Sequence, residues 1–265
     1  MMARDAVARV VEVRPHPLPY FTLVLSVPDE YAGIAAGQFV MLETSAGLEP
    51  YLRRAFSVAD VSNREREVEI DLLAKIVGRG TRAMAALRPG ERRALLGPLG
   101  RGFSLPDDGA VALVAGGVGS APLLLLARQL AERGVRFDFY YGGRSAHDLA
   151  RRDDFARLAV TSGGALIAAT EDDSLGFHGA VTAAFAAELD AGRVYRSCYA
   201  CGPMPMLAEL ARLGAERGVS GEAALETEMG CGYGACLGCA VPHTSGRFAL
   251  CCKEGPVFRL DEVLW

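Results

Sequence analysis

Five of the seven cysteines in this 265-residue chain lie in one short segment, and their spacing restricts the fold more than any other feature. Four residues separate Cys231 from Cys236, and two separate Cys236 from Cys239. A Cys-x4-Cys-x2-Cys run with a more distant fourth cysteine is the plant-type spacing for a 2Fe–2S cluster. The interleaved glycines let the backbone approach the cluster and supply amide donors to its sulfurs. We therefore predict a loop that wraps around a 2Fe–2S cluster.

The fourth cluster ligand is expected to be Cys251 or Cys252. Adjacent residues of an extended segment point to opposite sides, so only one can readily face the cluster, and the spacing does not choose between them. A zinc site is the alternative, although zinc sites usually use two separated Cys-x2-Cys pairs and do not need glycines. His243 alone could not supply a Rieske centre, because such a centre needs two histidine ligands. His243 is therefore expected at the surface.

Length, composition and charge indicate a globular protein of about two domains. Half of the residues are apolar, and 23% are charged. The net charge of −4 argues against a protein that binds a nucleic-acid backbone. The start of the chain shows no signal-peptide pattern, and the clustered cysteines favour metal or redox chemistry over disulfides, so a cytoplasmic location is expected. Residues 109–127 carry no charge, but glycines and a proline divide them into a strand, a turn and a helix.

The order of apolar segments predicts three units. Residues 1–105 read as an antiparallel β-barrel with strands at 7–13, 20–27, 38–43, 55–61 and 68–77 and a short helix at 81–87. Residues 106–220 alternate strands (111–115, 135–141, 165–170, 194–200) with helices (122–133, 181–189, 204–217), which indicates a doubly wound parallel sheet. Residues 221–265 form a small 2Fe–2S unit that is too short to fold by apolar burial alone.

Two loops of the α/β unit are candidate binding sites for NAD. Gly116, Gly117 and Gly119 form a turn between a buried strand and a helix, where backbone amides could hold a pyrophosphate. Pro122 stands where a full dinucleotide fingerprint has its third glycine, so the turn alone is a weak signal. The second loop, Cys201-Gly202-Pro203, follows another strand and would emerge at the same edge of the sheet.

Two segments of the β unit could hold a flavin. Arg54, Ala55, Phe56 and Ser57 combine a charge, an aromatic ring and a hydroxyl on one strand. A second strand ends in a glycine turn before a short helix, which is another possible phosphate cradle. Either segment alone could be ordinary β surface.

Taken together, these motifs resemble one family, the electron-transfer subunit of class 1B dihydroorotate dehydrogenase in the ferredoxin–NADP reductase superfamily. The resemblance extends over the chain, from Arg54-Ala-Phe-Ser57 and Val77-Gly-Arg-Gly-Thr81 to the cysteine run and its Gly-Pro-Val-Phe tail. It implies FAD, a 2Fe–2S cluster and NAD as co-substrate. It also implies an FMN-containing catalytic partner, in a heterotetramer of two of each subunit, that acts in pyrimidine biosynthesis. No nucleic acid or membrane partner is implied.

The resemblance also assigns residues. Its FAD contacts correspond to the following positions: Arg54, Ala55, Phe56, Ser57, Leu73, Ala74, Lys75, Gly80 and Thr81. It selects Cys252 as the fourth cluster ligand, two residues before the tail. Ala55 departs from the family, which commonly has proline there. The subunit is expected to be an oxidoreductase component without a catalytic acid or base of its own. A flavin/2Fe–2S subunit of a ferredoxin or sulfide dehydrogenase type complex is the alternative, and a zinc-stapled binding module without redox activity is a more distant one.

Overall fold

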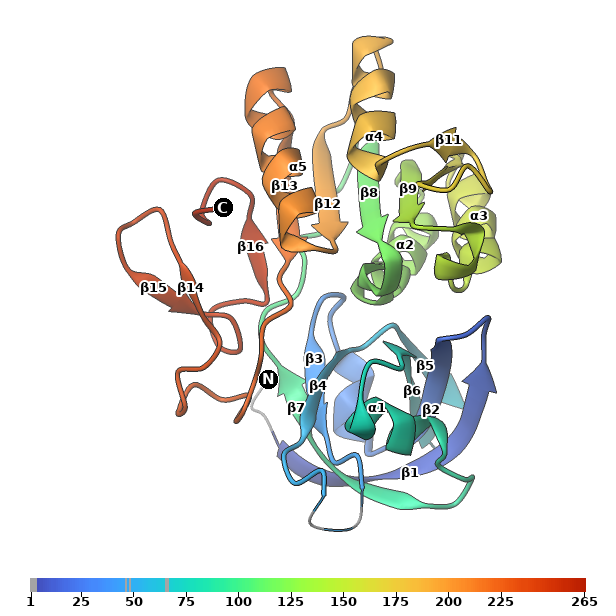
Figure 1. The fold of residues 1–265 in the computed structure, drawn as a ribbon, viewed down its shortest axis with the longest axis vertical. Helices are drawn as coiled ribbons and strands as arrows, with labels where there is room; N and C mark the ends of the chain where they lie inside the picture. Colours follow the sequence, from blue (N-terminus) through green and yellow to red (C-terminus); the bar gives the residue numbers. More distant parts are fainter. Residues whose placement is uncertain (1–3, 46, 48, 65–66) are drawn as a thin grey trace.

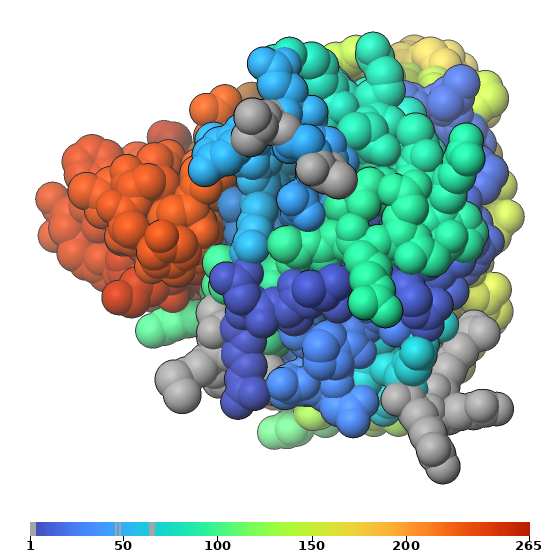
Figure 2. Space-filling view, turned by 90° about the horizontal axis from the view of Figure 1, so that it is seen from below, coloured from blue at the N-terminus to red at the C-terminus, as the bar shows by residue number. Residues whose placement is uncertain are grey.

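The computed structural model describes residues 4–45, 47, 49–64 and 67–265. It contains two seven-stranded sheets and a separate pair of strands near the C-terminus. In Figure 1 the first sheet lies at the bottom, the second at the top, and the C-terminal segment to one side of both. The space-filling view from below shows the same orange and red segment standing out beside the first unit (Figure 2).

The first sheet is antiparallel throughout, in the strand order β4-β3-β7-β1-β2-β6-β5. Side chains along β6 alternate between the core and the other face, as expected for a sheet with one face buried. The sheet curls so that β4 approaches β6 and forms a half-barrel. Its elements are β1 (Arg4–Pro15), β2 (Tyr20–Val27), β3 (Phe39–Leu42), β4 (Arg54–Ser57), β5 (Asp60–Arg64), β6 (Glu67–Lys75), β7 (Arg92–Leu99), the 3-10 turn η1 (Asp29–Gly33) and α1 (Arg79–Ala85).

The second sheet has the order β11-β10-β9-β8-β12-β13-β16, and every neighbouring pair is parallel except β13 with β16. Its strands are β8 (Val111–Gly116), β9 (Phe137–Gly143), β10 (Leu166–Thr170), β11 (Phe177–His178), β12 (Ser197–Cys201), β13 (Ser220–Ala224) and β16 (Val257–Arg259). Its helices are α2 (Ala121–Glu132), α3 (Arg152–Thr161), α4 (Val181–Asp190) and α5 (Met204–Arg217), with the short turns η2 (Gly117–Ser120) and η3 (Ala146–Asp148).

Alternate residues of the central strand β8 enter two different apolar cores. Leu113 and Ala115 pack with α2, α3 and the interior of the half-barrel, which form one continuous cluster. Ala112 and Val114 pack on the opposite face with α4 and α5. Since both faces of the strand are covered, its sequence is apolar without interruption.

The C-terminal segment begins and ends in the second sheet. After β13 the chain forms the cysteine-rich loop and the hairpin of β14 (Ala240–Pro242) and β15 (Phe248–Leu250), and then returns as β16 to pair with β13. Its buried residues include Cys239, Cys251 and Cys252, and they join a core with Phe39 and Met41 of the half-barrel. The segment therefore packs against both larger units, in addition to any stabilisation by a metal.

The fold class predicted from the sequence is confirmed, and most predicted elements lie close to their observed bounds. The helix at 204–217 is confirmed, and the uncharged stretch 109–127 divides into β8, η2 and α2 as expected. The single strand predicted at 55–61 is wrong, because the chain bends at Val58 and Ala59 and forms two strands, β4 and β5. No helix in the described part of the chain is long and apolar enough to span a membrane. The unit boundaries at 105 and 220 stay predictions.

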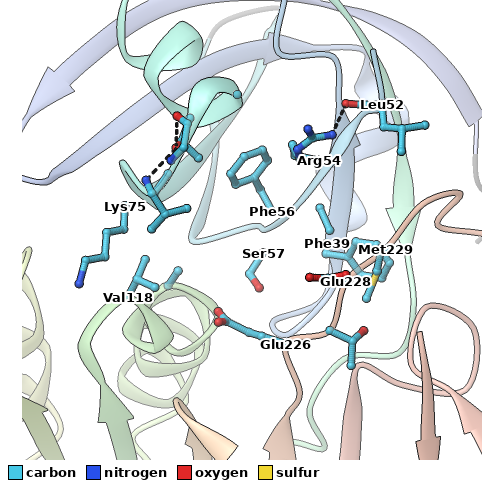
Figure 3. A pocket seen from close by; sticks show the side chains of 18 of the residues that line it. Phe39, Leu52, Arg54, Phe56, Ser57, Lys75, Val118, Glu226, Glu228 and Met229 are labelled. Carbon is cyan, nitrogen blue, oxygen red and sulfur yellow. Dashed lines mark hydrogen bonds between the residues drawn. The ribbon is translucent and has the colours of Figure 1, made fainter. Parts of the chain in front are cut away.

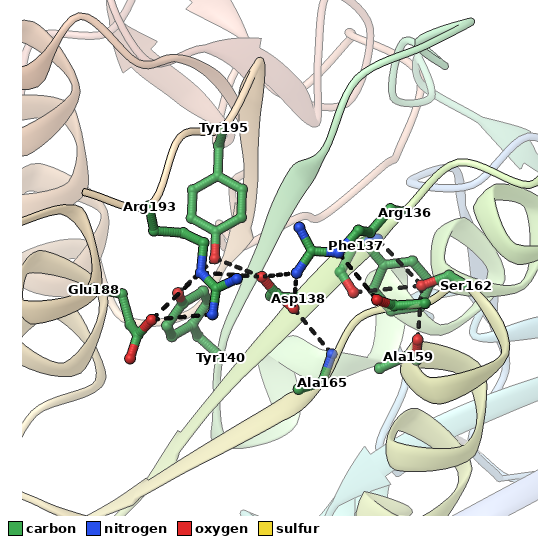
Figure 4. Close-up of polar contacts among 11 residues, drawn as sticks. Arg136, Phe137, Asp138, Tyr140, Ala159, Ser162, Ala165, Glu188, Arg193 and Tyr195 are labelled. Carbon is green, nitrogen blue, oxygen red and sulfur yellow. Dashed lines mark hydrogen bonds and ion pairs between the residues drawn. The ribbon is translucent and has the colours of Figure 1, made fainter. Parts of the chain in front are cut away.

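A buried polar network joins β9 to the helical layers at the amino end of the second sheet (Figure 4). Asp138 is only 1% exposed, and its carboxylate accepts hydrogen bonds from the Tyr195 hydroxyl (2.8 Å) and the Ala165 amide (2.9 Å). Arg136 lies 3.3 Å from the same carboxylate, and the Tyr195 hydroxyl also contacts that of Tyr140 at 2.7 Å. Because the buried charge is fully hydrogen-bonded, this network fits a structural role.

Candidate functional site

A cavity of about 900 Å³ opens where the half-barrel, the second sheet and the cysteine-rich loop meet (Figure 3). All nine residues predicted to contact FAD line it: Arg54, Ala55, Phe56, Ser57, Leu73, Ala74, Lys75, Gly80 and Thr81. Val118 and Ala121 of the glycine turn and of α2 also line it, as do Cys236 and Gly238 of the cysteine-rich loop. One cavity is thus lined by residues of the predicted flavin segments, the glycine turn and the cysteine-rich loop.

The two neighbouring arginines of the β4 segment have different surroundings. Arg53 pairs with Asp5 at 2.6 Å, whereas Arg54 lines the cavity. Arg54 Nη1 donates to the Leu52 carbonyl at 2.6 Å, and no carboxylate among residues 4–45, 47, 49–64 and 67–265 pairs with Arg54. Its positive charge is therefore available to an anionic ligand. The Thr81 hydroxyl is occupied locally, because it accepts hydrogen bonds from the amides of Val77 and Gly78.

Two threonine hydroxyls near the cavity bear on the fit of a large polar cofactor. Thr227 lines the cavity, and Thr44 lies beneath Gly80, where a Cβ would stand 3.4 Å from its hydroxyl oxygen. The Thr44 hydroxyl is buried without a hydrogen-bond partner among the described residues, whereas the Thr227 hydroxyl faces the buried Cys251 thiol. Buried hydroxyls normally have partners, so a bound cofactor is a natural explanation for the Thr44 hydroxyl. With Arg54, the Phe56 ring and the cavity volume, it fits a flavin dinucleotide.

The two loops predicted to bind NAD lie against each other at the carboxyl ends of β8 and β12. A Cβ on Gly119 would stand 2.3 Å from the Cys201 carbonyl oxygen, and one on Gly116 would stand 2.8 Å from Pro203 Cδ. Gly202 approaches the Gly116 amide in the same way. Only glycine allows such close contact between backbones. Their role in binding NAD stays a prediction.

Three residues that sequence reasoning did not connect join the two sheets beside the glycine turn. The Tyr20 hydroxyl donates to Asp148 at 2.7 Å, and Lys75 Nζ lies 3.7 Å from the same carboxylate. A Cβ on Gly117 would stand 3.6 Å from the Tyr20 hydroxyl. Burial, followed by the Asp148 hydrogen bond, raises the pKa of Tyr20, so Tyr20 remains a donor at neutral pH. No sequence motif marks this contact, because its members are 128 residues apart.

The four predicted cluster ligands lie in two contacting pairs. The Cys236 amide donates to Cys231 Sγ at 3.5 Å, and the Cys252 amide donates to Cys239 Sγ at 3.4 Å. Burial opposes ionisation of Cys231, but backbone amides directed at its sulfur outweigh this and lower its pKa to about 6. Among the described side chains no group of three or more His, Cys, Asp or Glu surrounds a single-ion site. Two pairs of thiols with amide donors fit a cluster with two iron atoms.

The side chains of Cys251 and Cys252 have different contacts. The Cys252 side chain lies beside Cys239 and faces the Gly234 amide. The Cys251 thiol donates instead to the Leu225 carbonyl at 3.4 Å, on the side of the FAD cavity. Burial raises the pKa of both thiols to about 12, so ionisation does not distinguish them. These contacts favour Cys252 as the fourth ligand, which stays a prediction.

Sequence reasoning predicted no catalytic acid or base in this chain and no role for an acidic residue of the cavity, and it missed Glu226. This residue follows the end of β13 and lines the same cavity as Ser57, and both are labelled in Figure 3. Protein atoms crowd the carboxyl group and raise the pKa of Glu226, although the open cavity leaves the side chain accessible to water. No sequence motif marks this position, because a lone glutamate after a short strand is ordinary.

Comparison with known proteins agrees with this site. Family models match an oxidoreductase FAD-binding domain at residues 12–103, an oxidoreductase NAD-binding domain at 113–212 and the iron–sulfur cluster binding domain of dihydroorotate dehydrogenase B at 226–264. A solved structure of an NADH-dependent reduced ferredoxin-NADP oxidoreductase has a TM-score of 0.85 at 28% identity, over 97% of this chain and 90% of that one. The fold and site thus define an oxidoreductase of the ferredoxin reductase type with domains for FAD, NAD and a 2Fe–2S cluster.

Curated relatives identify the family. The dihydroorotate dehydrogenase B (NAD(+)) electron transfer subunit of Desulforamulus reducens is 38% identical over 253 residues, which is 94% of each chain. The protein of the same name from Geobacillus kaustophilus is 37% identical over 233 residues, 86% of each chain. The chain belongs to the family of dihydroorotate dehydrogenase B electron transfer subunits, as its motifs predicted.

Proposed function

We propose that this chain carries electrons from a dihydroorotate-oxidising subunit, through a 2Fe–2S cluster and FAD, to NAD+ in pyrimidine biosynthesis. The observation that carries the proposal is the shared cavity, because Arg54 and Ser57 on one side and Cys236 on the other line the same space. A flavin in this space would lie beside the cluster loop, because Cys236 and Gly238 of that loop line the same cavity. Bound flavin exchanges hydrides with nicotinamide and single electrons with iron–sulfur clusters.

The residues around the cavity have separate tasks in this scheme. Arg54 neutralises the FAD phosphates, and Phe56 and Ser57 bind and orient the ring system. The glycine turn and the Cys201-Gly202-Pro203 loop bring NAD+ to the flavin from the second sheet. Cys231, Cys236, Cys239 and Cys252 hold the cluster, and backbone amides donate hydrogen bonds to the sulfurs of Cys231 and Cys239.

The catalytic partner docks over the exposed side of the cluster loop. Tyr233, Leu237 and Phe248 are large apolar residues of this segment, and they are 62%, 63% and 70% exposed. The ligand Cys236 is exposed in the same loop. An apolar surface around a cluster suits an interface with a partner flavin, here FMN, because it excludes water from the electron path. The proposed complex is a cytoplasmic heterotetramer of two copies of each subunit, and free thiols such as these persist in a reducing compartment.

Reconstitution tests the proposal. The purified chain alone should contain FAD and iron, oxidise NADH with artificial acceptors and leave dihydroorotate unoxidised. The FMN subunit should restore electron transfer from dihydroorotate to NAD+, and light scattering should give the mass of two copies of each. Cluster removal should abolish this transfer and spare NADH oxidation by dyes. Dihydroorotate oxidation by the chain alone, or full transfer without the cluster, would contradict the scheme.

A second candidate is the same electron path in a ferredoxin- or sulfide-linked complex. The observation that favours it is the likeness in fold to the NADH-dependent reduced ferredoxin-NADP oxidoreductase over nearly the whole chain. Co-purification distinguishes the two, because only the orotate system brings down a flavoprotein that oxidises dihydroorotate.

A further inference from the structure

Hydride transfer between FAD and NAD depends on two units of this chain, and this inference rests on the proposed function. The predicted FAD segments belong to the half-barrel, whereas the glycine turn belongs to the second sheet. Near-attack geometry places the reacting atoms about 3–3.5 Å apart, and a displacement of about 1 Å can slow a reaction by about 10²-fold. The contacts between the two units therefore decide whether bound nicotinamide and bound flavin meet at a productive distance.

Three polar contacts cross from β2, β5 and β6 of the half-barrel to α2, η3 and the start of α3, which lie above these strands in Figure 1. We call these contacts the interdomain clamp, and they are Tyr20–Asp148 (2.7 Å), Asp60–Arg128 (2.7 Å) and Asp71–Arg151 (2.8 Å). In the two ion pairs the side chains are 11–29% exposed. Since water and salt screen partly buried pairs less than exposed ones, the clamp can resist relative motion of the two units.

The part of the clamp that belongs to the second unit is connected to the glycine turn. Ala150 lies between two members of the clamp, and its carbonyl accepts a hydrogen bond from the Tyr141 hydroxyl at 2.9 Å. The Tyr141 hydroxyl also contacts that of Ser120 at 2.8 Å, and Ser120 is the fully buried last residue of η2. At the start of the same turn, a Cβ on Gly117 would stand 3.6 Å from the Tyr20 hydroxyl. A shift of the clamp therefore shifts the turn.

The backbone of Arg151 shows that this segment is held in place. Its φ angle is 59°, in the left-handed region that residues other than glycine rarely adopt. Such a conformation persists only where the surroundings determine it. Here Arg151 Nη1 donates to Asp71 at 2.8 Å across the interface, and Nε donates to Asp154 of α3 at 2.7 Å. Loss of the Asp71 carboxylate therefore releases the segment to which the glycine turn is connected.

We propose that the interdomain clamp positions the glycine turn opposite the flavin cavity, which makes Tyr20 and Asp71 positioning residues for hydride transfer between NADH and FAD. Neither residue is among the described residues that line the cavity, and both act through their partners Asp148 and Arg151. The clamp moves no proton and binds neither nucleotide. Its loss leaves both nucleotide-binding surfaces in place and lets the distance between them vary.

The near-isosteric variants Tyr20→Phe and Asp71→Asn test this role, with Glu67→Gln as the matched control. Glu67 lies on β6 like Asp71, but it pairs with Arg9 inside the half-barrel. In stopped-flow mixing of the FAD-loaded chain with NADH, the limiting rate of flavin reduction should fall by about 10- to 10²-fold in Y20F and in D71N. The NADH concentration that gives half of the limiting rate, and the FAD and iron contents, should stay at their wild-type values. E67Q should match the wild type in every measurement.

The distance between the two units gives a second readout that does not depend on the variants of the clamp. Val7 of β1 and Val160 of α3 lie in different units and are 60% and 70% exposed. Spin labels on non-natural amino acids at these two positions should show one narrow distance distribution by electron double resonance of the oxidised protein. The distribution should broaden in Y20F and in D71N.

Two results would overturn the proposal and leave the electron path standing. One is a broad distance distribution with the clamp intact, and this result counts even if the variants fail to fold. The other is a limiting rate in Y20F and D71N equal to that of the wild type. Failure of NADH to reduce the FAD of the wild-type protein would instead remove the proposed function.

Discussion

Removing the carboxylate of Asp138 should destabilise the protein without changing its cofactors. Asp138→Ala deletes two charge-assisted hydrogen bonds, from Tyr195 and Ala165, each worth about 1.5–3 kcal/mol. The Arg136 side chain is 38% exposed, so water solvates it after the substitution and its lost ion pair adds little. The expected loss in the free energy of unfolding is therefore about 3–6 kcal/mol.

Urea unfolding followed by circular dichroism measures this loss. With a slope of about 3 kcal/mol per molar urea, the midpoint of D138A should fall by about 1–2 M. Asp190→Ala is the control, because Asp190 forms an exposed pair with Arg217 at 2.8 Å, and such pairs contribute less than about 1 kcal/mol. Before unfolding, D138A should keep wild-type FAD and iron contents, since the network lies at the end of the sheet away from the cavity. Equal midpoints for D138A and D190A would refute the reasoning.

Three further predictions concern the cofactors. Iron retention, measured by iron analysis and visible absorption, should be lost in single alanine variants of Cys231, Cys236, Cys239 and Cys252 and kept in C251A. Iron loss in C251A with iron retention in C252A would reverse the assignment of the fourth ligand. Arg54→Ala should weaken FAD binding by about one to two decades, because one charge-assisted bond is lost, and should make the remainder more sensitive to salt; an unchanged fluorescence titration would contradict this role. Gly119→Ala should separate the two NAD loops, because its Cβ would stand 2.3 Å from the Cys201 oxygen, and should weaken NADH binding with FAD retained. If calorimetry gives the variant the NADH affinity of the wild type, the two loops do not form a nucleotide site.

Local patterns were sufficient to predict the elements that carry a strong apolar signal. Strand β8 and helix α5 were identifiable because each has uninterrupted or periodic apolar residues and a clear boundary, such as Gly218 after α5. Helix α3 was missed because only Phe155 and Ala159 of its ten residues are buried. Strand β7 was missed because Arg92 and Arg93 obscure its alternation, although Arg93 is buried against Glu91.

The residues of the candidate site likewise divide into those that the sequence could identify and those that it could not. Arg54, Ser57 and the cysteine run could be identified as candidates because each belongs to a contiguous motif that resembles the family's, and their roles stay predictions. Glu226, Thr44 and the contact between Tyr20 and Asp148 could not be predicted in this way. Their significance depends on pairings between distant segments, and only the assembled sheets bring those segments together.

The return of the chain to β16 has a mechanical consequence for the cluster. The segment that carries the cysteines leaves the second sheet at Ala224 and rejoins it at Val257, and these two residues are partners in the β13–β16 pair. Arg101 in the segment between the sheets also donates its amide to the Gly255 carbonyl at 2.6 Å. A loop whose two ends are both paired in the sheet cannot move its metal centre between donor and acceptor, whereas a tethered carrier domain can. Electrons must therefore cross a gap of fixed length inside this subunit, and the approach of the partner is the step left to diffusion.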